Sequence, residues 1–191
     1  MKNKRVIIIA AICIVLIVGG FFIFTNRTRK NPEDVELTTV QQIITKDLTG
    51  NYPKTPREVI KTYNEIITCF YNEECTDEEI EKLSERVLLL LDEELLANNP
   101  KNEYIKNLKT EISDHKAKGK TIISYNLSSS NEIEFRTVDE RECAYVDCSY
   151  FIKDKKGYSK SYMTYVVRKD ENNEWKILVF YQSEGDTSDG E

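Results

Sequence analysis

The chain has 191 residues and a formal net charge of −6, which is spread unevenly along its length. All 33 acidic residues lie from Glu33 onward, whereas six of the 27 basic residues lie at or before Lys30. The part after Lys30 therefore carries 21 basic and 33 acidic side chains, a net charge of −12. Such a surface repels phosphate backbones and anionic lipid headgroups, so the composition argues against nucleic-acid binding.

The first element in chain order is the uncharged stretch Val6–Phe24. A helix of this length covers roughly 28 Å, which is enough for a hydrocarbon core of about 30 Å. The apolar run continues past Val18–Gly20, its nearest match to a signal-peptide cleavage site, and therefore favours an uncleaved anchor. We expect a short tail over residues 1–5, one transmembrane helix over 6–24, and a single-pass protein of the cell membrane.

The orientation of this span is not settled by counting charges, because three basic residues lie on each side of it. A short basic tail is poorly suited to export, whereas a long following domain crosses a membrane largely regardless of its charge. We therefore expect the N-terminus in the cytoplasm and the domain outside. A domain on the cytoplasmic side is the alternative if this orientation is inverted.

Residues 25–54 form a polar stretch with weak apolar spacing, which we interpret as a stalk or linker that could form a short helix or lie against the domain. The first strong helix signal is Thr55–Glu58, a capping box with proline at the first helical position, and it predicts a helix to about Tyr71. A second box, Thr76–Glu79, begins the next helix. Its apolar turn Leu88–Leu91 is either deeply buried or ends that helix before a separate short one. A third helix is predicted from about Lys101 to Lys118, where Gly119 would end it.

After Gly119 the period of the apolar residues changes from that of a helix to that of a strand. The predicted strands are Thr121–Leu127, Glu132–Val138, Cys143–Lys153, Tyr158–Lys169 and Trp175–Gln182. Residues 183–191 are acidic and are predicted to be a disordered tail. The pattern predicts an α+β domain over residues 55–182, with about three helices packed on a curved antiparallel sheet of about five strands.

This order of elements resembles the nuclear transport factor 2-like fold, also called the cystatin-like cone. The closing stretch Trp175–Phe180 is similar to the tryptophan-led last strand that is common in that fold. The stretch Asn51–Val59 resembles a signature of uncharacterised bacterial single-pass membrane proteins. The layout of tail, span and outer cone is also similar to the inner-membrane scaffold component of type IV secretion systems. The resemblance implies helices packed into a strongly curved sheet, and it implies no particular chemistry.

Four cysteines follow the predicted span: Cys69, Cys75, Cys143 and Cys148. Two interpretations stay open, namely free thiols or disulfides such as Cys69–Cys75. Cys143 and Cys148 cannot bridge each other, because their odd separation on one strand places them on opposite faces. The chain has no CxxC motif and one histidine, so we expect no metal site.

The candidate site residues are mostly aromatic. Tyr63, Tyr104, Tyr150, Tyr165 and Trp175 could line a cone interior that binds an apolar or sugar-like ligand, or they could fill the core. Asp147 is the one acid/base candidate, and its alternative interpretation is a solvated strand residue. His115 lies on the apolar stripe of its predicted helix, where a partly buried imidazole needs no function.

The sequence contains no nucleophile elbow and no glycine-rich phosphate loop. The main hypothesis is therefore a membrane-anchored, outward-facing binding or scaffold module without a cofactor or catalytic site. The alternative is a small-molecule sensor, or an isomerase- or cyclase-like enzyme, that uses a pocket in the cone. Aromatic residues predicted on the outer sheet face suggest a homodimer or a membrane-protein partner; they are Tyr145, Phe151 and Tyr162.

Overall fold

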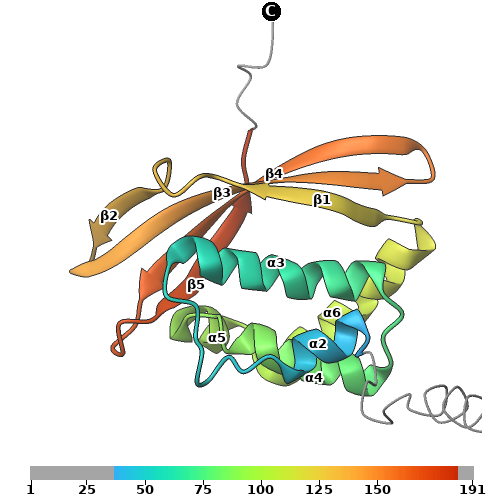
Figure 1. The fold of residues 1–191 in the computed structure, drawn as a ribbon, viewed down its shortest axis with the longest axis horizontal. Coiled ribbons are helices and arrows are strands. Elements are labelled where there is room, and N and C mark those ends of the chain that lie inside the picture. Colours follow the sequence, from blue (N-terminus) through green and yellow to red (C-terminus); the bar gives the residue numbers. More distant parts are fainter. Residues whose placement is uncertain (1–36, 185–191) are drawn as a thin grey trace, which may run out of the picture. The chain divides into compact units, whose positions relative to one another are not determined.

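The computed structural model describes residues 37–184, and the chain divides into two units, Met1–Leu37 and Thr38–Glu191. Helices come first and strands second, and the α+β class with an antiparallel five-stranded sheet is confirmed (Figure 1). The predicted tail, the span Val6–Phe24 and residues 185–191 lie outside the described residues. Between residues 37 and 184 no helix is both long and apolar enough to cross a membrane.

The described part has five helices, whereas the sequence predicted about three. They are α2 (Thr39–Thr45), α3 (Pro56–Asn72), α4 (Asp77–Leu88), α5 (Glu93–Asn98) and α6 (Lys101–Ala117). The additional helices have separate causes. Helix α2 lies within the predicted stalk, and α5 is separated from α4 because the backbone between them pairs with the last strand.

The predicted stalk is not a free linker where it is described. Val40 of α2 and Leu48 after it are both buried. The Arg86 guanidinium of α4 donates a hydrogen bond to the Ile44 carbonyl at 2.6 Å, which holds α2 against α4. The second unit begins at Thr38, whereas the domain predicted from the sequence began at Thr55. The weak apolar spacing of this stretch marks a short helix on the core.

The predicted helix boundaries are confirmed for α3 and α4 within a residue or two. Thr55 and Glu58 form the reciprocal capping box at the start of α3, and Thr76 and Glu79 repeat it for α4. Helix α6 ends before Gly119, whose φ of +64° is readily adopted by glycine and strained for other residues.

The sequence left open whether the turn after α4 is deeply buried or ends the helix, and the structure shows both. Leu90 is completely buried, and the helix also ends at this point. Leu90 accepts a hydrogen bond from the Ile177 amide at 2.8 Å, and the Asp92 amide donates back to the Ile177 carbonyl at 2.8 Å. This exchange attaches the end of the helical layer to the sheet.

The strands are β1 (Thr121–Leu127), β2 (Glu134–Val138), β3 (Arg141–Asp154), β4 (Gly157–Lys169) and β5 (Trp175–Gln182). The sheet order is β1-β3-β4-β5, and β2 pairs with the same long strand β3 as β1 does. The register shifts at Ile122/Ser124 and again at Val166/Val167. Such bulges increase the local twist and bend of a sheet, which lets it curve over the helices.

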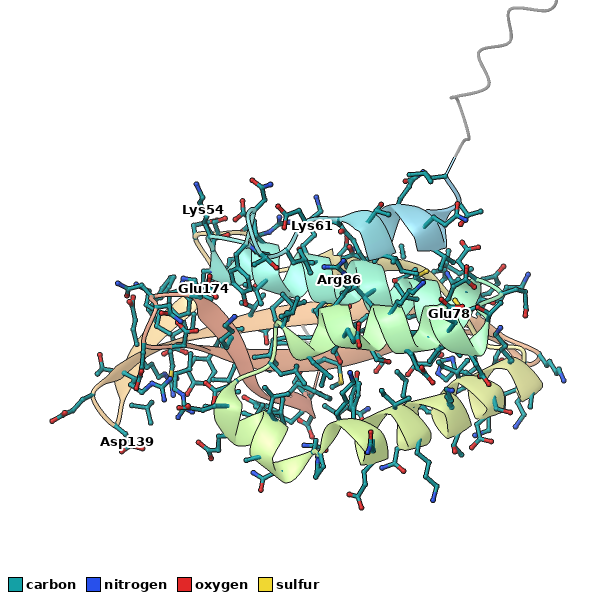
Figure 2. All side chains as sticks on the ribbon, turned by 90° about the horizontal axis from the view of Figure 1, so that it is seen from below. Lys54, Lys61, Glu78, Arg86, Asp139 and Glu174 are labelled. Carbon is teal, nitrogen blue, oxygen red and sulfur yellow. The ribbon has the colours of Figure 1, made fainter. Side chains whose placement is uncertain are left out.

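One face of the sheet covers the helices, and the other faces away from them. Helix α3 runs beneath the sheet in Figure 1, and Ala144, Val146 and Cys148 of β3 are buried on the inner face, as the alternation predicted. Viewed from the helical side in Figure 2, charged side chains such as Lys61 of α3 and Glu78 of α4 are exposed. The core thus lies between α3, α4 and the inner face of the sheet.

Candidate functional site

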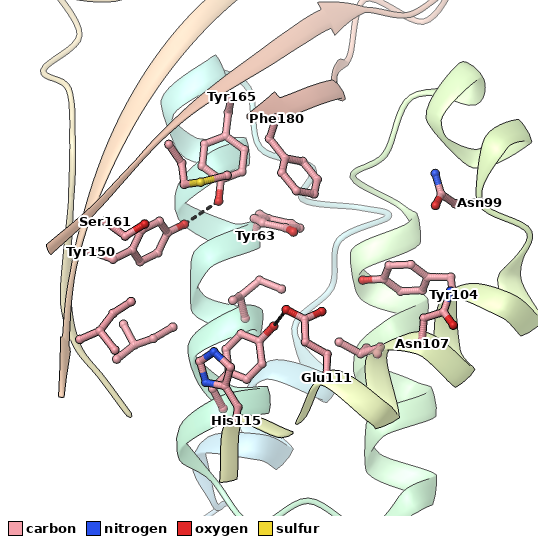
Figure 3. Close-up of a pocket in the computed structure, with 16 residues that line it drawn as sticks. Tyr63, Asn99, Tyr104, Asn107, Glu111, His115, Tyr150, Ser161, Tyr165 and Phe180 are labelled. Carbon is pink, nitrogen blue, oxygen red and sulfur yellow. Dashed lines mark hydrogen bonds between the residues drawn. The ribbon is translucent and has the colours of Figure 1, made fainter. Parts of the chain in front are cut away.

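A cavity of about 370 Å³ lies between two helices and the inner face of the sheet. Helices α3 and α6 form one wall and strands β3, β4 and β5 form the other (Figure 3). Ligand sites in proteins commonly have volumes of about 300–1,000 Å³, so this space is large enough for a small molecule.

Four of the five aromatic residues predicted to line the cone surround this cavity. Tyr63 comes from α3, Tyr104 from α6, Tyr150 from β3 and Tyr165 from β4. Trp175 does not line it. Its indole lies at the start of β5, where it packs edge-on against Phe135 with ring centroids 5.9 Å apart. The strand direction decides this difference, because the first residue of β5 lies far along the sheet from Phe180, which does line the cavity.

Asp147, the acid/base candidate, does not face the cavity. Neighbouring residues on a strand point to opposite faces, and Asp147 lies between the buried Val146 and Cys148. Its carboxylate is on the outer face and accepts a hydrogen bond from the Thr164 hydroxyl at 2.6 Å. The alternative interpretation, a strand residue exposed to solvent, describes its position.

The upper end of the cavity in Figure 3 is aromatic. The Tyr63 and Tyr165 rings meet edge to face with centroids 5.6 Å apart, and Phe180 lies 5.7 Å from Tyr165. Tyr165 and Phe180 are direct partners on β4 and β5, so the sheet register brings them together. Phe180 lines the cavity and remains 41% exposed.

A buried hydrogen-bond chain holds the hydroxyl groups at this end. Asn64 of α3 is fully buried, and its amide nitrogen donates to the Ile60 carbonyl at 2.9 Å. The Asn64 amide oxygen therefore faces Tyr150, which donates to it, and the Tyr150 and Tyr165 hydroxyls are 2.5 Å apart. Because the one proton of Tyr150 goes to Asn64, Tyr165 is the donor to Tyr150.

The other end of the cavity carries three polar side chains. Tyr71 of α3 donates a hydrogen bond to the Glu111 carboxylate of α6 at 2.7 Å, and the Tyr71 ring stacks on His115 at 4.0 Å (Figure 3). The Nδ1 atom of His115 is buried without a hydrogen-bond partner within the described residues. Glu111 is four residues before His115, so one helix turn places both on the cavity side.

Neither Glu111 nor Tyr71 was among the residues predicted from the sequence. The signal for Glu111 was its spacing of three and seven residues from Leu108 and Tyr104, which places it on the same helix side. The pairing of Tyr71 with Glu111 had no sequence signal, because it joins residues on two helices that contact only in the folded chain.

Burial sets the protonation state of these groups. It raises the pKa of Tyr63, Tyr104, Tyr150 and Tyr165, so all four hydroxyls are protonated at neutral pH. For His115, burial first and the charge of Lys120 second lower the pKa below its ordinary value of 6.5. The imidazole is consequently neutral at pH 7.

The cysteines do not take part in this cavity. The four cysteines of the described part are free thiols, of which Cys69, Cys143 and Cys148 are buried. Among residues 37–184 no cluster of histidine, cysteine and acidic side chains is arranged to hold a metal ion.

The outer sheet face carries a second group of aromatic residues. Phe151 and Tyr158 stack with centroids 5.2 Å apart and planes inclined by 4°, and Tyr158 is 64% exposed. Arg136 lies over the Tyr145 ring at 4.8 Å. Val179 and Tyr181 of β5 are also exposed and share this face with Phe151.

The fold and site thus define an α+β domain whose helices and sheet enclose a tyrosine-lined cavity. The chain belongs to the family described as Domain of unknown function (DUF6715), whose model matches residues 1–180. A search of curated proteins finds no match to the chain.

Proposed function

We propose that this protein is a binding module that takes a small molecule into the cavity between α3, α6 and the sheet. The proposal rests on the volume of the cavity together with the side chains that line it. A space of about 370 Å³ is bounded by aromatic rings, and its hydroxyl groups are already held by hydrogen bonds. Ligand sites are typically apolar with a few fixed polar groups, and this arrangement matches that description.

We favour binding over catalysis, because the hydroxyl groups of Tyr71 and Tyr165, one at each end of the cavity, are already engaged in hydrogen bonds. Tyr71 is committed to Glu111, and Tyr165 is committed through Tyr150 to Asn64. Such groups orient a ligand, whereas a general acid or base needs a pKa near the working pH. Burial moves the pKa of these tyrosines away from neutrality.

The proposal includes the nuclear transport factor 2-like cone and the predicted location. A sheet bent by two bulges over a helical layer is compatible with such a cone. We propose that Val6–Phe24 anchors the domain at the outer side of the cell membrane. A reporter fused after Glu191 should then be active outside the cytoplasm, and activity only in the cytoplasm would refute this orientation.

The binding proposal can be tested with two matched tryptophan substitutions on α6. Asn107 lines the cavity at an exposed position, whereas Asn102 is exposed on the same helix and does not line it. Saturation-transfer NMR would screen water-soluble cationic, neutral and anionic aromatic fragments against the full chain in nanodiscs. At least one fragment should bind, and Asn107→Trp should abolish its signal while Asn102→Trp keeps it. No binding at all, or equal binding to both variants, would refute the proposal.

A second candidate function is a scaffold that contacts another copy of itself through the outer sheet face. The exposed Phe151–Tyr158 stack favours it, because stacked exposed aromatic rings are typical of protein contacts. Cross-linking in intact cells should then give a dimer that Phe151→Lys weakens. A monomer alone, with no cross-linked partner, would contradict this function.

A further inference from the structure

Among the described residues that line the cavity, Glu111 is the one acidic side chain, and none is lysine or arginine. His115 adds no positive charge, because burial keeps its imidazole neutral. The charge of Glu111 adds to burial in raising the pKa of Tyr104, which lies two turns earlier on the same helix. An anionic ligand would therefore meet the Glu111 carboxylate with no lysine or arginine in the lining to offset it, and Lys120, whose charge acts on His115, lies outside the lining.

The fixed hydrogen bonds also leave acceptors facing the ligand. Tyr71 gives its proton to Glu111, and Tyr165 gives its proton to Tyr150. Each of these two hydroxyl oxygens can only accept a further hydrogen bond, and a carboxylate accepts only. A ligand that donates hydrogen bonds matches Glu111 and Tyr71, which lie at the same end of the cavity, whereas a ligand with only acceptors leaves them unpaired.

Aromatic faces supply a third feature. Tyr63, Tyr165 and Phe180 form one cluster (Figure 3). Tyr71, which donates its hydrogen bond to Glu111, and Tyr104 also line the cavity. Aromatic rings attract cations through their electron-rich faces, and the attraction is strongest where water is excluded. Rings beside a single carboxylate are a suitable environment for an ammonium group with an apolar body.

We propose that the ligand is an organic ammonium ion, with its N–H groups toward Glu111 and Tyr71 and its apolar body among Tyr63, Tyr165 and Phe180. This inference rests on the proposed function, because it names the chemical class of the molecule that the cavity binds. Charge, hydrogen-bond direction and ring placement each favour the same class.

The experiment uses probes that share one body and differ in charge. The probes are 2-phenylethylammonium, its neutral counterpart 2-phenylethanol and the anion 3-phenylpropanoate. Their dissociation constants would be measured by calorimetry on the full chain in nanodiscs of zwitterionic lipid. The ammonium probe should bind at least roughly tenfold more tightly than the alcohol, and the anion should not bind.

A carboxylate substitution tests whether Glu111 is responsible. Glu111→Gln keeps the shape and can still accept from Tyr71, but it removes the charge. It should weaken binding of the ammonium probe roughly tenfold and leave the affinity for the alcohol unchanged. Glu103→Gln is the matched control, because Glu103 is exposed on the same helix and does not line the cavity. It should alter neither affinity.

The outcomes separate this inference from the proposed function. If the alcohol or the anion binds as tightly as the ammonium and Asn107→Trp blocks it, the cavity is a ligand site and the ammonium assignment is wrong. Equal loss of ammonium binding in Glu111→Gln and Glu103→Gln would also overturn the assignment, since it would indicate general surface attraction. If no probe and no fragment binds, both proposals fail.

Discussion

Replacing Tyr150 by phenylalanine tests the buried hydrogen-bond chain that organises the cavity. The substitution removes one oxygen atom and keeps the ring. It leaves the amide oxygen of Asn64 without a donor at a position that is 0% exposed, and it takes from Tyr165 the acceptor of its proton. An unsatisfied buried polar group costs about 1–3 kcal/mol, and a lost hydrogen bond contributes about 1 kcal/mol more. We expect Tyr150→Phe to lower the free energy of unfolding by about 2–4 kcal/mol.

A double-mutant cycle with Asn64→Leu separates the hydrogen bond from general packing. Leucine removes the orphaned amide as well, so the double variant should lose at least about 1 kcal/mol less than the sum of the single variants. Tyr158→Phe serves as control, because that hydroxyl lies on an exposed ring of the outer face.

The assay is urea unfolding of the full chain in nonionic detergent, followed by the fluorescence of Trp175. This residue is the only tryptophan of the chain, and it is 5% exposed, so its emission reports the folded core. This reasoning would be refuted if Tyr150→Phe had the same urea midpoint as the wild type. It would also be refuted if the loss of stability in the double variant equalled the sum of the losses in the two single variants.

Three further predictions concern charge and pH. Arg168→Met should lower the free energy of unfolding by about 3 kcal/mol, because Arg168 pairs with the Asp92 carboxylate at 2.6 Å and Asp92 is 1% exposed. Lys82→Met breaks an ion pair on the surface and should leave the urea midpoint unchanged. Equal effects of the two substitutions would contradict this expectation. Burial raises the pKa of the Cys148 thiol from 9.0 to about 11. The folded state keeps this proton, so the stability that the protonated thiol contributes is fully present below pH 9 and is lost as the pH rises toward 11. The free energy of unfolding of Cys148→Ala should therefore fall less steeply over that range. Burial, and after it the charge of Lys120, lowers the pKa of His115. The stability that the neutral imidazole contributes is therefore fully present above pH 6.5 and is lost as the pH falls below that value. His115→Phe should remove that part of the acid slope, and an unchanged slope would count against the assignment.

Local signals in the sequence were sufficient for most of the secondary structure. Capping boxes at Thr55 and Thr76 locate the starts of α3 and α4, because a cap needs only residues within one helix turn. The alternation in β3 identifies its buried face, because successive side chains on a strand point to opposite sides. Helix α2 falls in the predicted stalk, because its few apolar residues gain their burial only from α3 and α4.

Composition, capping and periodicity by themselves determined the α+β order of elements, the inner face of the sheet and the aromatic character of its interior. These depend on interactions between residues close together in the chain. The tertiary structure alone decided that Tyr71 meets Glu111, that Asn64 orders the two tyrosine hydroxyls, and that Trp175 lies away from the cavity. These contacts join residues from different helices and strands, so they depend on sheet register and helix packing, which no local pattern specifies.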